Sequence, residues 1–577
     1  MKILEINVKN FRNLDGISVK FNPEFNFIVG ENNIGKSNFL DLLKIIFRKS
    51  SFDEDDFTDN SEPIEIKFSL RLSDKELGHF DDLIDPKNEN RINIICKQDI
   101  SEEYFQFFHE ETETAIPKFK IRGINFIHYD SLRNPIQELG FDNKRGVGKF
   151  LARIIERNLK IREISQRDII HEKTLEEVIV EINSKLSKIR TFQDFDIKVG
   201  LDNNIVSLLP KMLTLREMNK NELRKVGYGV QFLMIITLSI LEQIDSLINS
   251  KREKVIFESD DRKTISLVLG LDEPELHLHP HLQRTLIKYL KQIVLNEDEN
   301  FNLLIKELFD IDDFDGQIIA VTHSPNVILG DYHQVIRFYY SGGKNVKVIS
   351  GENLNLSDNE VKHLHRRFPF IKEAFFSRGV ILVEGESEES SLGLFAQTLG
   401  INFDDYGISV IKVGGIEAME PLKKVIEQFG IKTVGIVDKD DGDRNYSDPL
   451  IFVTNKRDFE EEIVDNLLEK NEDKLLGMIM ELDNKGAERS FNEEAVKKRL
   501  FKGNKPKYSG IIETPKILKL SECLTPEEYK SFYLMWFIVN KSQLLGYIIG
   551  ERLSREEIPE VYENVILRIR ELVVENA

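Results

Sequence analysis

The feature that most constrains this chain is a glycine-rich loop between an apolar strand and an amphipathic helix. The loop, GENNIGKS at residues 30–37, follows the apolar residues 25–29 and precedes the periodic segment NFLDLLKIIF. It fits G-x(4)-G-K-[ST], in which backbone N–H groups wrap phosphate oxygens, the lysine reaches the outer phosphates and the hydroxyl binds Mg²⁺. The dipole of the following helix favours an anion there. The predicted nucleotide contacts in the loop are Gly30, Asn32, Asn33, Gly35, Lys36 and Ser37.

Polar residues at two later strand ends complete this pattern. Asp272 and Glu273 follow the apolar residues 265–271, and His323 follows residues 317–321. The first carboxylate suits a Mg²⁺ contact, and the second can polarise the water that attacks the γ-phosphate, which makes Glu273 a catalytic candidate. His323 can contact the γ-phosphate or hold that water. Strands, loops and helices alternate along the chain, so we expect a mainly parallel α/β sheet.

A second unit begins near residue 377 and carries its own acidic strand ends. Glu384 follows the apolar residues 379–383, and Asp438 and Asp440 follow residues 432–437. Because the carboxyl ends of parallel strands meet at one sheet edge, these side chains are expected to lie close together. Carboxylates suit Mg²⁺, Mn²⁺ or Ca²⁺, and two such ions can drive phosphodiester cleavage. The predicted metal ligands are Glu384, Glu388, Asp438 and Asp440 at this edge and Ser37 at the nucleotide, and Glu384, Asp438 and Asp440 are the catalytic candidates.

The charge balance limits the partners of the chain. Its 577 residues include 79 basic and 99 acidic ones, a formal charge of −20. Such a chain has no global attraction for DNA or a membrane surface, so nucleic-acid contact needs a local patch or a bound metal. One basic cluster is dense enough to grip phosphates, although a solvated loop is the alternative. Its members are Lys497, Lys498, Arg499, Lys502, Lys505 and Lys507.

The remaining composition excludes other classes of protein. Two cysteines, Cys96 and Cys523, exclude a disulfide framework and a cysteine-rich zinc site. No apolar run approaches the 18 residues of a membrane span, and the first residues lack a signal-peptide layout. A cytoplasmic protein without a membrane partner is therefore expected.

The pattern also predicts the domain organisation. Residues 1–375 are expected to form one domain, with a helical insertion at about residues 144–200 that is either a dimerisation element or ordinary surface helices. Residues 376–577 are expected to form a second domain whose tail, from about residue 465, is helical and charged.

The first domain resembles the ABC-type ATPase heads of the SMC and RecF group. The motifs that carry the resemblance are KNFRNL, GENNIGKSN, DEPE with LHP downstream, and THSP. The resemblance implies ATP and Mg²⁺ bound between two heads, where a signature loop of one head touches the nucleotide of the other. Here Gly229 and Gln231 stand in that loop, which lacks the usual serine and so implies slow hydrolysis. Arg133 is a further candidate contact near the ATP site or the dimer partner.

The second domain resembles the TOPRIM fold, and both together resemble the OLD (overcoming lysogenization defect) family of nucleases over nearly the whole chain. The E-G and D-x-D motifs carry this resemblance. It implies that Glu460 adds a metal ligand, with Glu461 and Glu462 as competing registers. It also implies that Lys541 stabilises charge in the transition state.

The function expected from these features is an ATP-binding, divalent-metal-dependent DNA endonuclease gated by its ATPase head and acting in phage defence or DNA processing. The implied partners are DNA, further copies of the chain through the heads and the insertion, and a helicase or another defence-system protein. A non-cutting clamp of the RecF type is the alternative. A topoisomerase-like enzyme is a third hypothesis, which requires a tyrosine nucleophile facing the carboxylates.

Overall fold

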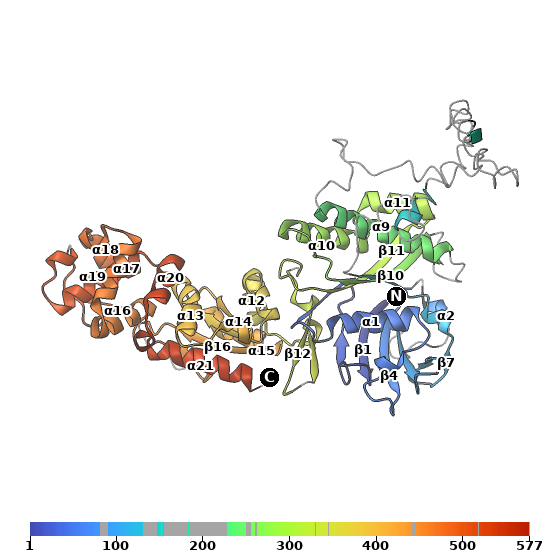
Figure 1. Cartoon of the computed structure of the whole chain (residues 1–577), viewed down its shortest axis with the longest axis horizontal. Helices are drawn as coiled ribbons and strands as arrows, with labels where there is room; N and C mark the ends of the chain where they lie inside the picture. Colours follow the sequence, from blue (N-terminus) through green and yellow to red (C-terminus); the bar gives the residue numbers. More distant parts are fainter. Residues whose placement is uncertain are drawn as a thin grey trace.

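The computed structural model shows two lobes in succession along its long axis (Figure 1). It describes residues 1–130, 147–154, 180–184 and 228–575, with gaps inside these ranges at 75, 81–82, 84–89, 152, 181–182, 250–255, 260–261, 329, 344, 441–445 and 517. Arg133 and most of the predicted insertion at 144–200 lie outside the described residues. The first lobe carries the glycine-rich loop and the second carries the acidic strand ends.

The first lobe contains an antiparallel sheet that the expected parallel arrangement did not include. Its strands alternate between buried and half-buried residues, as the burial of β5 shows, which is typical of a sheet covered on one face. In sheet order the strands are β2 (Ser18–Lys20), β1 (Lys2–Lys9), β4 (Ile64–Arg71), β5 (Arg91–Gln98), β6 (Gln106–His109) and β7 (Ala115–Ile116). Each neighbouring pair in this order is antiparallel.

The second sheet of this lobe is mainly parallel and holds the nucleotide loop. Its order is β13 (Val346–Ser350), β12 (Val335–Tyr340), β3 (Phe25–Gly30), β11 (Asp313–Val321), β10 (Arg262–Asp272) and β8 (Asn125–Tyr129), with β9 (Ile256–Ser259) antiparallel to β10. Every residue of β3 is buried, as expected of a strand covered on both faces. The strand ends of β3, β10 and β11 therefore meet at one edge.

Helices cover both faces of the parallel sheet (Figure 1). Helix α1 (Lys36–Arg48) lies between this sheet and the antiparallel sheet, and its buried residues share one hydrophobic cluster with both. The other face packs against α9 (Tyr228–Asn249), α10 (Pro280–Val294) and α11 (Glu299–Phe309). No described helix is both long and apolar enough to cross a bilayer.

The second lobe is built on a parallel sheet of β15 (Ile408–Lys412), β14 (Gly379–Val383), β16 (Lys432–Val437) and β17 (Ile451–Val453), in that order. Helices α12 (Asp358–Ile371) and α15 (Met419–Gln428) cover one face, and α13 (Glu386–Thr398) and α21 (Glu560–Val574) cover the other. This arrangement is Rossmann-like, so the predicted fold class is confirmed.

The tail of this lobe is helical, as predicted, and adds one unpredicted hairpin. The helices are α16 (Phe459–Lys470), α17 (Glu472–Leu482), α18 (Glu493–Leu500), α19 (Pro526–Val539) and α20 (Gln543–Arg552). The hairpin pairs β18 (Phe501–Lys502) with β19 (Lys505–Pro506) directly after α18. The basic cluster thus occupies the end of α18 and this hairpin.

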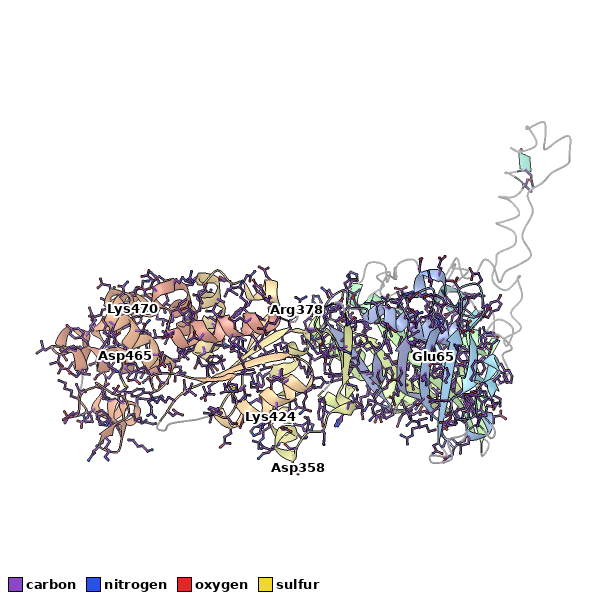
Figure 2. The ribbon with its side chains drawn as sticks, turned by 90° about the horizontal axis from the view of Figure 1, so that it is seen from below. Glu65, Asp358, Arg378, Lys424, Asp465 and Lys470 are labelled. Carbon is purple, nitrogen blue, oxygen red and sulfur yellow. The ribbon has the colours of Figure 1, made fainter. Side chains whose placement is uncertain are left out.

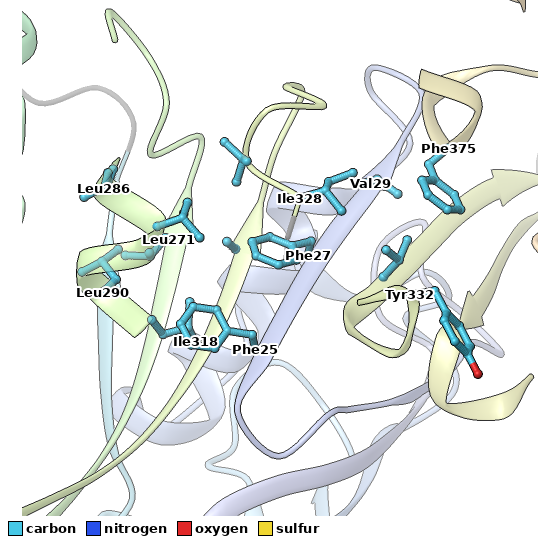
Figure 3. Packing of buried hydrophobic residues seen from close by; sticks show 14 of the residues in the cluster. Phe25, Phe27, Val29, Leu271, Leu286, Leu290, Ile318, Ile328, Tyr332 and Phe375 are labelled. Atoms are coloured by element: carbon cyan, nitrogen blue, oxygen red, sulfur yellow. The ribbon is translucent and has the colours of Figure 1, made fainter. Parts of the chain in front are cut away.

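The two lobes share buried contacts at their junction. One hydrophobic cluster extends from Phe27 and Leu286 of the first lobe to Phe375 (Figure 3). The same cluster includes Val380 and Leu382 of β14. Arg337 of β12 is 1 % exposed and donates hydrogen bonds to the carbonyl oxygens of the second lobe and its entry segment. Arg378, at the junction in Figure 2, donates from Nε to Oε2 of Glu31 in the glycine-rich loop at 2.6 Å. The nucleotide loop and the second lobe are therefore in direct contact.

Candidate nucleotide and metal sites

The glycine-rich loop has a backbone that its glycines make possible. Gly30 has φ of +139°, and a Cβ there would lie 2.2 Å from the carbonyl oxygen of Phe338. Gly35 has φ of +104° and forms the N-cap of α1, so that the loop turns directly into the helix. Any larger side chain at Gly30 would separate β3 from β12. The loop therefore holds backbone N–H groups at a helix N-terminus, as phosphate binding requires.

Lys36 lies folded against this loop. Its Nζ donates to the carbonyl oxygens of Gly30 at 2.9 Å and Glu31 at 2.5 Å. Burial lowers the pKa of Lys36 to about 8, although the nearby carboxylates of Glu273 and Asp272 act in the opposite direction. The ammonium group is thus close to the position expected for phosphate, where two backbone carbonyl oxygens hold it.

The acidic strand end lies beside the loop. Ser37 Oγ donates to Asp272 Oδ1 at 3.2 Å, and burial raises the pKa of Asp272 to about 6. Glu273 has φ of +46°, and its Oε1 lies 3.3 Å from Nε2 of His323. Burial, followed by the charge of Lys36, lowers the pKa of His323, which favours the neutral imidazole at pH 7. A neutral imidazole beside Glu273 can help to orient a water that contacts both side chains.

A cavity of about 560 Å³ joins these residues, a volume within the range of small-molecule sites. Its lining residues are Asn32, Asn33, Gly35, Lys36, Ser37, Asn38, Glu273 and His323. Gly229 and Gln231 lie in the first turn of α9, where side chains are not described.

Glu275 is part of this architecture, although the sequence analysis gave it no role. Its Oε1 accepts hydrogen bonds from Thr322 Oγ1 at 2.7 Å and from the backbone N–H of His323 at 2.8 Å. The side chain is 7 % exposed, and burial raises its pKa. Glu275 thus ties the end of β10 to the end of β11 and fixes where His323 stands. The signal was the last glutamate of DEPE, opposite the threonine of THSP.

In the second lobe, the ends of β14 and β16 bring Glu384 and Asp438 to one sheet edge. Gly385 follows and is the N-cap of α13. A Cβ at Gly385 would lie 2.5 Å from Oε2 of Glu388 and 3.4 Å from Cε of Lys541. The glycine of the E-G motif therefore makes room for the Glu388 carboxylate and the lysine.

Lys541 joins the acidic residues from the loop between α19 and α20. Its Nζ donates to Glu460 Oε2 at 2.9 Å, while Ser387 Oγ donates to Glu460 Oε1 at 3.2 Å. The neighbouring glutamates point elsewhere: Glu461 accepts from Lys530 Nζ at 2.9 Å and Glu462 from the backbone N–H of Lys456 at 2.6 Å. Of the three registers considered, Glu460 is the one that faces Lys541.

The electrostatics of this cluster are unfavourable without a cation. Burial raises the pKa of Glu388, raises that of Asp438 well above its usual range and raises that of Glu460 to about 7. Burial alone would lower the pKa of Lys541, but the charges of Glu460, Glu388 and Asp438 outweigh it and raise the pKa. Close carboxylates favour protonation or a bound cation. Lys541 is the positive group that holds them together here.

A divalent cation fits this donor set. Carboxylate oxygens are its preferred ligands, and Glu388 Oε2 is buried without a hydrogen-bond partner among the described residues. Within the described ranges, no three Asp, Glu, His or Cys side chains already stand in metal-binding geometry. Metal binding therefore requires these carboxylates to draw closer together.

Asp440 stands apart from the buried carboxylates. It is 43 % exposed, has φ of +52° and lies with its Oδ1 4.0 Å from Nη2 of Arg457. Its backbone N–H donates to the carbonyl oxygen of Arg457 at 2.8 Å. The structure thus places Asp440 near the start of α16 rather than beside Lys541.

Asp458 belongs to the same acidic segment as Glu460, which the family resemblance links to the metal site. It caps α16 by accepting from the backbone N–H of Glu461 at 2.9 Å, and it accepts from the hydroxyl of Tyr508 at 2.7 Å. Burial raises its pKa. The signal was available, because an Asp followed three residues later by Glu is an N-cap pattern.

The tyrosine nucleophile of a topoisomerase-like enzyme is not supported by the residues near this cluster. Burial raises the pKa of Tyr508, whose hydroxyl donates to Asp458. Burial likewise raises the pKa of Tyr562, which lies beneath the carboxylates and is fully buried. The Tyr508 hydroxyl is thus engaged with Asp458, and Tyr562 is shielded from solvent.

Comparison with known proteins agrees with the two-lobed architecture. Residues 1–328 match the AAA ATPase domain family, and residues 375–440 match the TOPRIM domain of overcoming lysogenization defect protein-like proteins. The Old nuclease of Escherichia phage P2 is 22 % identical over 76 % of this chain and 77 % of its own length. The endonuclease GajA of Bacillus cereus strain HuB5-5 is 24 % identical over 72 % of this chain and 61 % of its own.

Among solved structures, the C-terminal region of the Burkholderia pseudomallei OLD protein is 20 % identical and aligns with 34 % of this chain and 99 % of its own, at a TM-score of 0.24. A TM-score this low carries no structural argument. The two family matches confirm the resemblance predicted from the sequence and imply use of a nucleotide and a divalent metal. The chain therefore belongs to the AAA ATPase domain family and carries an overcoming lysogenization defect protein-like TOPRIM domain behind its ATPase domain.

Proposed function

We propose that the chain is an ATP-regulated, divalent-metal-dependent DNA endonuclease. One observation carries the proposal: Glu388, Asp438 and Glu460 are gathered around Lys541 at the carboxyl edge of a parallel sheet, with raised pKa values. Natural proteins seldom bury several carboxylates together unless a cation joins them. The names of the two relatives above support the same class of reaction.

Within this proposal, Glu384, Glu388, Asp438 and Glu460 hold the metal, and Asp440 closes on it from its exposed position. When bound, the metal supplies an activated water and charge for the leaving oxygen. The water oxygen forms a bond to phosphorus, and the bond from phosphorus to the leaving deoxyribose oxygen breaks. The attacking water gives up a proton to solvent, and the leaving oxygen takes one up from solvent. Lys541 is placed to neutralise charge that develops on the phosphate.

The head binds ATP in the cavity beside the loop. Lys36 exchanges its bonds to backbone carbonyls for bonds to phosphate, and Ser37 and Asp272 hold Mg²⁺. Glu273, oriented by His323, polarises the attacking water. We further propose that two heads pair over the nucleotide, with Gly229 and Gln231 of one copy facing the ATP of the other. A role in phage defence or DNA processing follows from the family resemblance, as does a helicase or other defence-system partner.

A plasmid-nicking assay tests the proposal. Supercoiled plasmid is incubated with the full chain and Mg²⁺ or Mn²⁺, with and without ATP, beside Glu384→Gln and Lys36→Ala. The matched control is Glu386→Gln, which removes the same charge from an exposed position two residues away, where the carboxylate pairs with Lys412. We expect metal-dependent nicking that is lost only in Glu384→Gln. Nicking by Glu384→Gln at the wild-type rate would refute the assignment of the site.

The Lys36→Ala reaction shows whether ATP bound to the head raises or lowers the rate of nicking. Loss of an ATP effect with retained nicking would place regulation in the head. The RecF-type clamp is not favoured, because a protein that only binds DNA has no need for buried carboxylates. If ATP-dependent DNA binding persists in wild type and Glu384→Gln while neither nicks, the clamp becomes the better description.

A further inference from the structure

The basic cluster at the end of the second lobe is unusual in this acidic chain. Residues 495–507 include six basic residues and no acidic one, against a net charge of −20 for the whole chain. Lys497, Lys498, Arg499 and Lys505 are exposed. Within the described ranges, none of these four forms an ion pair with a carboxylate. Their charge is therefore available to an external anion.

The hairpin places two like charges opposite each other. Lys502 and Lys505 are direct cross-strand partners, and Gly503, with φ of +65°, makes the tight turn between them. Like charges directly opposite each other destabilise an antiparallel pair. A polyanion lying across the hairpin would contact both lysines.

The basic side chains stand on a fixed base. Val496, Leu500 and Phe501 are buried in a small hydrophobic cluster with Leu534 and Met535 of α19. The backbone N–H of Lys507 donates to the carbonyl oxygen of Leu500 at 2.8 Å, which closes the hairpin onto the helix. The positive charges are thus presented on a rigid surface and not on a mobile loop.

A chain of contacts joins this surface to the carboxylate cluster. Arg457 Nη1 donates to the carbonyl oxygen of Lys507 at 3.2 Å, and its guanidinium lies 5.3 Å from the ring centre of Tyr508. The Tyr508 hydroxyl donates to Asp458, the N-cap of α16. Glu460, two residues further along, accepts from Lys541. Figure 1 shows α16, α18 and α19 together at one end of the molecule.

We infer that the end of α18 and the β18–β19 hairpin, which together we name the basic hairpin, bind the phosphate backbone of DNA and hold it in register with the carboxylate site. The inference rests on the proposed nuclease function. Exposed lysines and arginines supply affinity for DNA of any sequence through release of counterions. The hydrogen bond between Tyr508 and Asp458 links the basic hairpin to the carboxylate site. The partner chemistry is therefore a DNA phosphodiester backbone.

The test compares two triple variants of the full chain that lose the same charge. One is Lys498→Ala/Arg499→Ala/Lys505→Ala, in the basic hairpin. The other is Lys470→Ala/Lys485→Ala/Arg570→Ala, at scattered exposed positions of the same lobe. Binding to a fluorescent 30-base-pair duplex (about three helical turns) is measured by anisotropy in EDTA between about 50 and 200 mM salt, so that no metal chemistry is needed.

We expect the hairpin variant to lose affinity by about 10- to 100-fold and the slope of log affinity against log salt to fall by about 2 to 3. The scattered variant should stay within about twofold of wild type. With Mg²⁺, the hairpin variant should nick with a raised KM and an unchanged kcat, and its ATP hydrolysis should match wild type.

Equal affinities and salt slopes for wild type and both variants would overturn the inference and leave the nuclease proposal intact. So would equal losses in the two variants, which would show an effect of net charge alone. If wild type binds DNA through the basic hairpin but never nicks, the nuclease proposal fails and the binding surface stands.

Discussion

Replacing Arg337 with methionine tests how firmly the two lobes are joined. The guanidinium is 1 % exposed and donates to the carbonyl oxygens of Phe375 at 3.1 Å, Phe429 at 3.0 Å, Gly430 at 3.3 Å and Ser377 at 2.6 Å. Burial lowers its pKa to about 10, so it stays charged at pH 7. Methionine replaces the aliphatic part of the arginine side chain but has no donor, so the variant leaves these carbonyls without their partner.

The magnitude follows from these four bonds. A hydrogen bond to a charged group contributes about 1.5–3 kcal/mol, which gives about 6–12 kcal/mol in total. Burying the guanidinium costs several kcal/mol, which the variant recovers. The net loss is therefore about 3–5 kcal/mol, similar to that for breaking a buried ion pair. By the factor of ten per 1.4 kcal/mol, the second lobe should open about 10²- to 4 × 10³-fold more often.

Limited proteolysis measures this opening, because cleavage tracks the open population when closing is fast. We expect Arg337→Met to be cut about 10²-fold faster between the lobes, at residues 372–378. Arg568→Met is the control, since Arg568 is 40 % exposed and its pair with Glu571 should contribute less than about 1 kcal/mol. Cleavage of Arg337→Met within threefold of wild type (about 0.7 kcal/mol) would refute the reasoning.

Three further predictions concern the two sites. The pKa of Lys36 is about 8, and bound phosphate would raise it. ATP affinity should therefore be constant below pH 8 and fall up to about tenfold per pH unit above it. An ATP affinity that does not change from pH 7 to 9.5 (about 1.5 units past that pKa) would contradict this prediction. Glu31→Gln removes the ion pair to Arg378 and should reduce the effect of ATP on plasmid nicking without abolishing nicking, and an unchanged ATP effect would contradict this. Gly385→Ala places a Cβ 2.5 Å from Oε2 of Glu388 and should slow nicking by at least about tenfold, while ATP hydrolysis stays normal. Gly393→Ala is the control, because a Cβ there meets nothing within 4 Å, and this variant should nick at the wild-type rate.

The strand ends could be predicted because apolar runs mark them directly. Residues 379–383 and 432–437 coincide with β14 and β16, since each run is bounded by polar or glycine-rich sequence. Pairing was harder to predict. The alternation in β1, β4 and β5 indicates strands with one covered face, but it does not say which neighbour each strand joins, and these strands form a separate antiparallel sheet.

Contacts between residues far apart in the chain could not be predicted from the sequence. Three adjacent glutamates offered no basis for choosing a register, because their partners Lys530 and Lys541 come about 70–80 residues later. The N-cap at Asp458 sets the phase of α16 and so decides that Glu460 faces Lys541. Arg337 gave no signal at all, since only the docked second lobe supplies its four carbonyl acceptors.

The contacts around Glu31 suggest how the two sites can influence each other. Its carbonyl oxygen accepts from Lys36, and its carboxylate pairs with Arg378, the residue directly before β14. Phosphate bound to the loop must draw Lys36 away from that carbonyl, which changes the balance of bonds that hold Glu31.

Strand β14 then leads in six residues from Arg378 to Glu384 at the carboxylate cluster. A strand buried on both faces moves as a unit, so a small shift at Arg378 changes the position of Glu384 relative to Asp438 on β16. Because metal binding requires these carboxylates to draw closer, ATP in the head can control cutting without any large motion of the lobes.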